Sequence, residues 1–271
     1  MSEAPSALGE LRTLWGARRL WWALTANDLR VRYLGSSIGF FWAVINPIVE
    51  VATYAFVFHV LLQVRFHNGQ SSAQYVLYLL CGMVAWSGFA DGVTRATTSI
   101  TSNAHLLRKV NFPPVVLPAQ MVGSAVVNQL IRWAILLLAC VLVGDGLSWH
   151  VLLIPPFVVA QSVFCLGAGL FLSVLQVHFR DVGHWVNASV LVGMFLTPVM
   201  YSPEAYVGPI RLLLHPNPMA QYVGLYRRLL LEHQLPGPVT TVLYAFLAAG
   251  FALTVGLSVF AHNRRRFADM V

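Results

Sequence analysis

Six long apolar runs, nearly free of charge, limit the folds open to this chain. A helix rises about 1.5 Å per residue, so about 20 apolar residues cross the hydrocarbon of a bilayer. The runs are continuously apolar rather than alternating, which argues against membrane strands. We therefore predict an all-α membrane protein with six transmembrane helices, at about 38–62, 73–95, 115–143, 150–176, 184–201 and 238–261.

Composition supports a membrane class. Of the 271 residues, 58% are hydrophobic and 10% are charged, and the mean hydropathy is +0.69. A soluble domain carries roughly 25% charged residues. The net charge of +7 comes from arginines scattered between the apolar runs, without a continuous basic stripe, so we predict no nucleic-acid partner.

The positive charges of the connections predict an orientation, because cytoplasmic loops are enriched in Lys and Arg. One side of the membrane receives most of them, and the other side receives Arg65 and the arginines of a longer connection. This bias places both termini in the cytoplasm. The residues on the predicted cytoplasmic side are Arg12, Arg18, Arg19, Arg30, Arg32, Arg108, Lys109, Arg180, Arg264, Arg265 and Arg266.

Residues 27–50 join a basic segment directly to the first apolar run, which places Arg30 and Arg32 at a membrane surface. Before this junction, residues 11–34 combine Trp and Leu at near-helical spacing with arginines. Trp and Arg together favour the headgroup zone, so we predict an interfacial helix over 11–34. The alternative is a poorly ordered basic tail, against which the dense Trp content argues.

The connection 202–237 has short apolar pieces broken by prolines. It is too interrupted to span a bilayer and too apolar for a free loop. We predict short re-entrant helices over 204–235 on the outer side, buried against protein. Arg211, Arg227 and Arg228 would lie there.

Lys109 is the only lysine, and it excludes a Walker A site from this sequence. Such a site needs a glycine-rich loop before the lysine and a Ser or Thr after it, whereas Val110 follows Lys109. If ATP drives the function, another polypeptide binds it. Around Lys109, residues 103–111 form a short basic segment between two spans, which is either a docking helix for a cytoplasmic partner or a solvated loop.

Charged side chains inside spans are costly and seldom idle. Asp91 and Arg95 stand at i,i+4 with the acid first, which favours pairing. Glu50 and Arg132 fall well inside the first and third spans and are candidates for a second pair. Structural ion pairing is our main interpretation of these charges, and a proton relay or a substrate contact is the alternative.

No catalytic or metal site emerges from residue spacing. His178, Asp181 and His184 have helical spacing, but no further ligand is apparent, so a polar turn between two spans is the preferred interpretation. The aromatic residues of the first and fifth spans are either packing residues or a surface on which sugar rings stack.

Several segments make the chain resemble the membrane subunit of ABC-2-type exporters of polysaccharides. The resemblance covers almost the whole chain and rests on five segments in the expected order, of which none is diagnostic alone. They are DLRVRYLGSSIGFFWAVINP at 28–47, LLRKVNFPPVVLP at 106–118, FRDVGHWVNASVLVGMFLTPVMYSP at 179–203, HPNPMAQYVGLYRRLLL at 215–231 and HNRRRFADMV at 262–271.

The resemblance implies a type V ABC exporter-like transmembrane domain of six spans in a bacterial inner membrane. It implies a homodimer with two ATP-binding subunits, which would carry ATP and Mg²⁺, so this chain itself would hold no cofactor. The substrate would be a lipid-linked glycan of O-antigen, teichoic acid, capsule or galactan type. Alternatives are an ABC-2 exporter of a drug or simple lipid, an ion-coupled transporter using the intramembrane charges, and an integral-membrane glycan transferase.

The resemblance also implies functional residues. Segments 11–34 and 103–111 would contact the ATP-binding subunits, and the path would lie between protomers along the first and fifth spans. The contact candidates are Arg30, Arg32, Asn103, His105, Leu106, Arg108, Lys109 and Asn111. The path candidates are Trp42, Glu50, Tyr54, Phe58, Phe195 and Tyr201, and Arg211, Arg227 and Arg228 are candidates for outer contacts with phosphate or glycan.

Overall fold

A computed structural model describes residues 6–33, 39–57, 72–107, 112–144, 146–203, 214, 216–264 and 267. All of the regular secondary structure in these ranges is helical. The elements are α1 (Ala7–Gly16), α2 (Arg18–Tyr33), η1 (Gly39–Phe41), α3 (Trp42–Ala55), α4 (Ser72–Ser102), α5 (Ala104–Leu107), α6 (Val116–Val143), η3 (Trp149–Leu153), α7 (Ile154–His178), α8 (Val182–Leu196), α9 (Pro218–Leu230) and α10 (Val239–Asn263).

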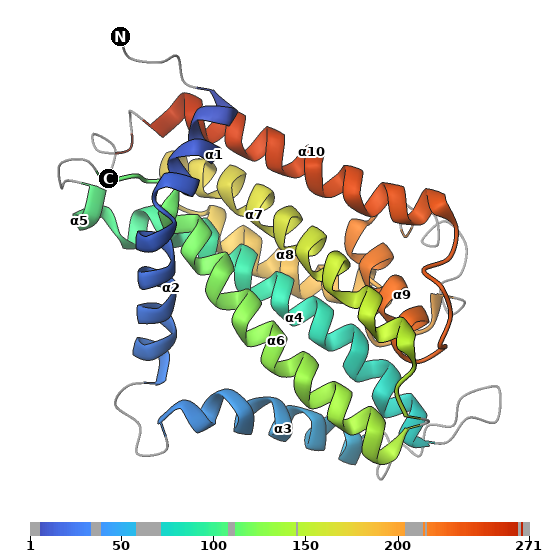
Figure 1. Ribbon diagram of the computed structural model, residues 1–271. Coiled ribbons are helices and arrows are strands. Elements are labelled where there is room, and N and C mark those ends of the chain that lie inside the picture. The colour runs from blue at the N-terminus through green and yellow to red at the C-terminus, as the bar shows by residue number, and fades with distance from the viewer. Residues whose placement is uncertain are drawn as a thin grey trace.

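Four long helices, α4, α6, α7 and α10, form the body of the bundle (Figure 1). Within the described ranges, four helical stretches are long and apolar enough to cross a membrane, namely Gln74–Ser102, Val116–Val143, Trp149–His178 and Val239–Asn263. They match the predicted second, third, fourth and sixth spans. Helix α4 continues beyond the predicted end at residue 95, because the segment after Arg95 keeps its helical bonds and buries Ile100.

The described parts of the predicted first and fifth spans contain α3 and α8. Helix α3 has 14 residues, and the rest of the predicted first span, residue 38 and residues 58–62, lies outside the described ranges. Helix α8 has 15 residues and ends before Thr197, where the backbone becomes extended. The six-span count therefore stays a prediction.

The predicted interfacial helix 11–34 is two helices in the structure. Ser6 caps α1, because its hydroxyl accepts a bond from the Gly9 N–H. The chain leaves helical geometry at Ala17 and resumes it in α2. Both helices lie at the end of the bundle that also carries α5 and the end of α10, and α2 runs steeply across the long helices (Figure 1).

Close backbone packing joins α7 to α10. A Cβ added at Gly256 would lie 2.2 Å from the carbonyl oxygen of Gly167, and one added at Gly167 would lie 2.3 Å from the carbonyl carbon of Ala252. Only glycine fits at such a crossing, which is the small-residue packing that membrane helices use in place of a hydrophobic driving force.

Helix α9 is inserted among the long helices at the opposite end from α2 (Figure 1). Asn217 caps it through bonds from the Met219 and Ala220 N–H groups, and Pro218 begins it. Tyr222 and Tyr226 are fully buried, and the Tyr222 hydroxyl donates to the Ala245 carbonyl of α10 at 2.8 Å. The region 204–235 thus contains a buried helix, while residues 204–213 lie outside the described ranges.

Candidate functional site

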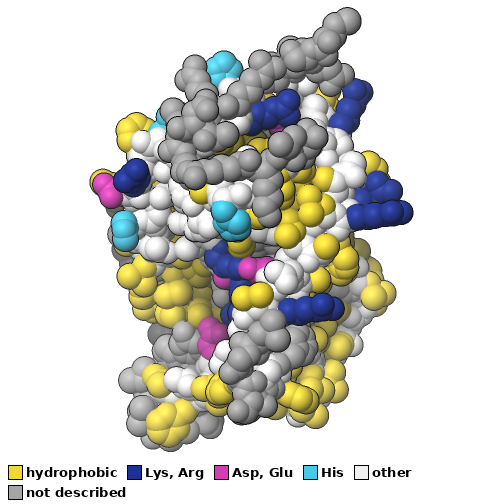
Figure 2. Space-filling view, turned by 90° about the vertical axis from the view of Figure 1, so that its left-hand side faces the viewer, with side chains coloured by type: hydrophobic (Ala, Val, Ile, Leu, Met, Phe, Trp, Pro, Cys, Tyr) yellow, Lys and Arg dark blue, Asp and Glu magenta, His cyan; other side chains and the backbone are white. Residues whose placement is uncertain are grey.

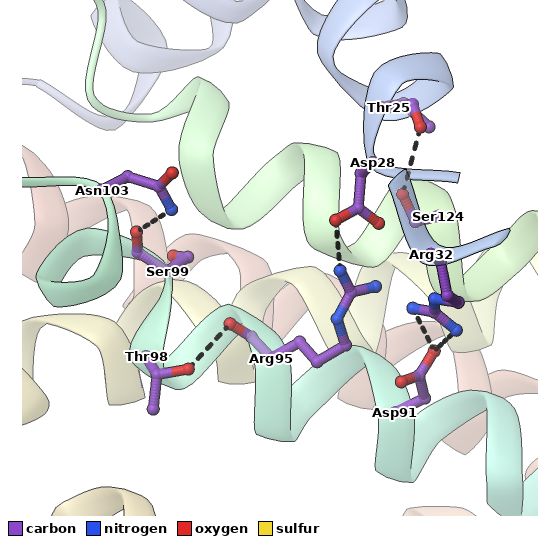
Figure 3. Close-up of polar contacts among 9 residues, drawn as sticks. All are labelled: Thr25, Asp28, Arg32, Asp91, Arg95, Thr98, Ser99, Asn103 and Ser124. Atoms are coloured by element: carbon purple, nitrogen blue, oxygen red, sulfur yellow. Dashed lines mark hydrogen bonds and ion pairs between the residues drawn. The ribbon is translucent and has the colours of Figure 1, made fainter. Parts of the chain in front are cut away.

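Two ion pairs tie α2 to α4 (Figure 3). The Arg32 guanidinium bonds to the Asp91 carboxylate at 3.3 Å, and the Arg95 guanidinium bonds to the Asp28 carboxylate at 2.5 Å. Asp28 and Arg32 are one turn apart on α2, and Asp91 and Arg95 are one turn apart on α4, so each helix offers an acid and a base to the other. The prediction that Asp91 and Arg95 pair with each other is therefore wrong, because α2 supplies a closer partner for each.

Asp28 is the more buried acid of this arrangement. Burial alone would raise its pKa, but the hydrogen bond and charge of Arg95, helped by Ser124 and Arg32, outweigh burial and lower the pKa below its ordinary value. One oxygen of Asp28, Oδ2, and one nitrogen of Arg95, Nη1, are buried without a hydrogen-bond partner in the described structure. The lowered pKa favours the carboxylate form of Asp28, and the pair keeps two buried atoms without a hydrogen-bond partner.

Helix α2 also packs on α6 beside the ion pairs. The Trp21 indole N–H donates to the Ala119 carbonyl at 2.9 Å, and the Ser124 hydroxyl donates to the Thr25 carbonyl at 3.4 Å. A Cβ added at Gly123 would lie 3.0 Å from the Trp21 ring, so this glycine lets the two helices approach. Any displacement of α2 would therefore act on both α4 and α6.

The described contact candidates for an ATP-binding subunit, Arg30, Arg32, Asn103, His105 and Leu106, lie on α2, α5 and the end of α4. Figure 2 looks onto the side of the bundle that carries α2 and α5, where Arg and His side chains gather among hydrophobic ones. Arg30 is exposed, whereas Arg32 is engaged with Asp91. Asn103 closes the end of α4 by donating to the Ser99 carbonyl at 2.8 Å.

The short helix α5 covers only part of the predicted docking helix 103–111. His105 is exposed, and Leu106 packs against the apolar cluster around Ile100. Arg108, Lys109 and Asn111 lie outside the described ranges, so their predicted role is untested.

Glu50 and Arg132 line one small cavity between α3, α4 and α6. Its volume of about 20 Å³ suits one water molecule. The Arg132 Nη1 donates to the Ser87 hydroxyl at 3.0 Å, and its buried Nε has no partner in the described structure. The predicted ion pair between Glu50 and Arg132 is not formed; the two side chains share the cavity instead.

Of the remaining path candidates, Trp42 lies on α3, Phe195 lies on α8 and Tyr201 follows the end of α8. Trp42 is half-buried on α3, while Phe195 and Tyr201 are about half exposed, at 48% and 50%. Helix α8 also exposes Trp185 and Leu191. Phe58 and the Tyr54 side chain are not among the described parts of the chain.

The two adjacent arginines of α9 differ sharply. Arg227 is 3% exposed, its guanidinium stacks 3.5 Å above the Tyr78 ring, and it donates to the carbonyls of Tyr78, Pro198 and Val199. Arg228 is bonded at the surface to the Gln234 side chain and the Leu235 carbonyl. Arg227 therefore holds α9 against α4 and the segment that follows α8. Because Arg227 is buried, Arg228 is the described candidate for the predicted outer contact with phosphate or glycan. Arg211, the other candidate, lies outside the described residues.

Two polar features of the structure were not predicted from the sequence. A buried network joins Gln129, Gln161 and Tyr226, in which the Tyr226 hydroxyl donates to Gln161 Oε1 at 2.7 Å and Gln161 Nε2 donates to the Ala85 carbonyl at 2.8 Å. A buried carboxylate, Glu10 of α1, pairs with Arg264 at the end of α10 at 2.6 Å. Glutamines within apolar runs were the available signal for the network, since polar groups in spans need partners.

Together, the span-length helices, the helices across one end of the bundle and the helix buried at the other define a multi-pass membrane protein. The ABC-2 type transporter family model matches residues 19–231, and the chain therefore belongs to this family.

Its relatives include two proteins described as O-antigen export system permease protein RfbA. The one from Myxococcus xanthus is 29% identical over 263 residues, covering 96% of this chain and 98% of the relative. One from Klebsiella pneumoniae is 29% identical over 251 residues, covering 92% of this chain and 93% of the relative.

Proposed function

We propose that this chain is the transmembrane subunit of an ATP-driven exporter that moves a lipid-linked polysaccharide across the cytoplasmic membrane. The observation that carries the proposal is the nearly full-length similarity to two O-antigen export permeases within the ABC-2 family. A polar glycan and its charged carrier headgroup cannot cross hydrocarbon unaided, because burying unpaired polar groups costs several kcal/mol each. A protein-lined path removes that cost.

The proposed assembly is a homodimer of six-span subunits with two copies of an ATP-binding subunit, which carry ATP and Mg²⁺. Its support in this sequence is the lack of a Walker A segment around the single lysine, Lys109. The common location of α1, α2, α5 and the end of α10 supports placing both termini on one side, which the basic connections assign to the cytoplasm (Figure 1).

The ion pairs between α2 and α4 suggest how an ATP-driven push reaches the bundle. A partner that presses on α2 and on the segment 103–111 would act on both helices of this contact, since α4 ends at Ser102, next to Asn103. Arg32–Asp91 and Asp28–Arg95 then make α2 and the cytoplasmic half of α4 move together. The glycan path would run along α3 and α8, whose exposed faces carry Phe195 and lead to Tyr201.

A second candidate within the same family is an exporter of a drug or a simple lipid. Membership of the ABC-2 family fits this candidate equally well, and only the names of the relatives favour a glycan. The ion-coupled transporter loses support, because Asp91 and Arg95 are engaged in ion pairs between helices. The glycan transferase loses support from the family match.

The test is reconstitution of the full chain with its cognate ATP-binding subunit. We expect ATP hydrolysis to be stimulated by a lipid-linked glycan and not by the lipid carrier alone. Stimulation by simple lipids or drugs only, or transport without an ATP-binding partner, would contradict the proposal. Alanine at both Arg108 and Lys109 should weaken co-purification of the partner, and unchanged co-purification would remove these residues from the docking surface.

A further inference from the structure

An apolar groove of about 720 Å³ runs along the outer face of α6 and α7. Its walls include Leu130 of α6 and Val159 of α7, which are 51% and 62% exposed, and one end is closed by Leu14, Trp21 and Trp22 of the N-terminal helices. The groove faces outward between two helices of span length. In a membrane, such a surface is in contact with lipid chains.

One end of the groove carries a positive charge without an acidic partner. Arg18 begins α2 one helical turn before Trp21 and Trp22, which line the groove, so it stands on the same face of α2 as these two residues. Its guanidinium is exposed, donates to the Trp15 carbonyl at 3.2 Å and lies 5.7 Å from the centre of the Trp15 ring. A guanidinium has five N–H donors, so most remain available to a ligand.

The acids of the two N-terminal helices do not neutralise Arg18. Glu10 pairs with Arg264 and Asp28 pairs with Arg95, and none of the described carboxylates lies within ion-pair distance of Arg18. A cation flanked by Trp residues is the composition that membrane proteins place at the headgroup level. The charge at this end therefore complements an anionic headgroup.

The length of the groove matches a bilayer. Its lining follows α6 from Ala119, beside Trp21, to Leu137, a rise of about 27 Å, which is close to a 30 Å hydrocarbon layer. An acyl chain whose headgroup lies at the level of Arg18 would fill the half of the groove nearer the N-terminal helices, as far as about Leu130.

We propose that this groove is a binding site for one anionic phospholipid, whose phosphate binds Arg18 and whose acyl chain lies between α6 and α7. The lipid would press against Trp21 and Trp22 and so hold α2 on α6. This site is separate from the α3 and α8 faces assigned to the glycan, and it does not depend on which substrate the protein exports.

The test compares lipid retention by the purified full chain, measured by native mass spectrometry. The protein is equilibrated with equal amounts of phosphatidylglycerol and phosphatidylcholine of identical chains. We expect the wild type to retain phosphatidylglycerol preferentially, and Arg18→Gln to reduce this preference about fivefold, as one arginine–headgroup contact implies. Arg19→Gln is the matched control, because it removes the same charge from the next, exposed residue off the groove face, and should leave the preference unchanged.

A second pair of variants tests the proposed binding site for the acyl chain. Leu130→Trp fills the groove and should reduce retention of both phospholipids, whereas Leu138→Trp, exposed on the same helix but outside the groove, should not. Equal retention of the two phospholipids by the wild type, or equal effects of the two arginine variants, would overturn the proposal. Displacement of phosphatidylglycerol by an equal amount of polyprenyl phosphate would also overturn it and would assign the groove to the lipid carrier.

Discussion

The Arg95 guanidinium of α4 reaches across to the Asp28 carboxylate of α2 at 2.5 Å, although Asp91 lies one turn away on its own helix. Asp91 is in turn engaged by Arg32 of α2. Each helix carries its acid one turn before its base along the chain, and the acid of each helix pairs with the base of the other. This arrangement fixes the position of α2 along α4 as well as its distance, because a shift of one turn would bring like charges together.

Asp28→Asn and Arg95→Gln should each lower the free energy of unfolding by about 1–2 kcal/mol, because each leaves a partly buried charge without its partner. The double variant should cost less than the sum of the two single variants. Thermal unfolding in detergent measures the three losses. Arg30→Gln, on the exposed side of α2, is the control and should change little; additive losses in the double variant would show that the two side chains act independently.

The contrast between predicted and observed pairing shows what the sequence could supply. Asp91 and Arg95 were recognisable as functional charges because they interrupt an apolar run, but their partners depend on how α2 crosses α4, which no local spacing encodes. The spans at α4, α6, α7 and α10 were predictable because length and hydropathy alone decide them. Arg227 and Arg228 are adjacent and could not be told apart from the sequence. The packing of α9 buries Arg227 and leaves Arg228 at the surface.

Arg227→Gln should destabilise the protein by about 2–4 kcal/mol, because the carbonyls of Tyr78, Pro198 and Val199 would lose a charged donor inside the bundle. Arg228→Gln should cost less than about 0.5 kcal/mol, since its contacts are at the surface. Thermal unfolding of the two variants in the same detergent makes the comparison. Equal melting temperatures would contradict the assignment of Arg227 to packing.

Gly167→Ala should separate α7 from α10, because its Cβ would overlap the backbone of Ala252. We expect a loss of about 2–3 kcal/mol or a failure to accumulate in the membrane. Gly250→Ala, on α10 with nothing near its added Cβ, is the control and should be neutral or stabilising by up to about 1 kcal/mol. If Gly167→Ala is as stable as the control, the helices can move apart without cost.

The carboxylate of Glu10 gives the contact between α1 and α10 a pH dependence. Burial raises its pKa above the ordinary value of 4.5, and the charge and hydrogen bond of Arg264 oppose that rise without cancelling it. The folded state therefore binds the proton more tightly than the unfolded state, so the contribution of Glu10 is complete below pH 4.5 and declines as pH rises through the raised pKa.

We expect the melting temperature of the wild type, relative to Glu10→Gln, to fall as the pH is raised from about 4 to about 7, because only the wild type must ionise a buried acid. Glu232→Gln removes an exposed carboxylate and controls for the change in net charge. A wild-type advantage that grows with pH would mean that the Arg264 pair outweighs burial, and the contact would then stabilise the ionised form of Glu10.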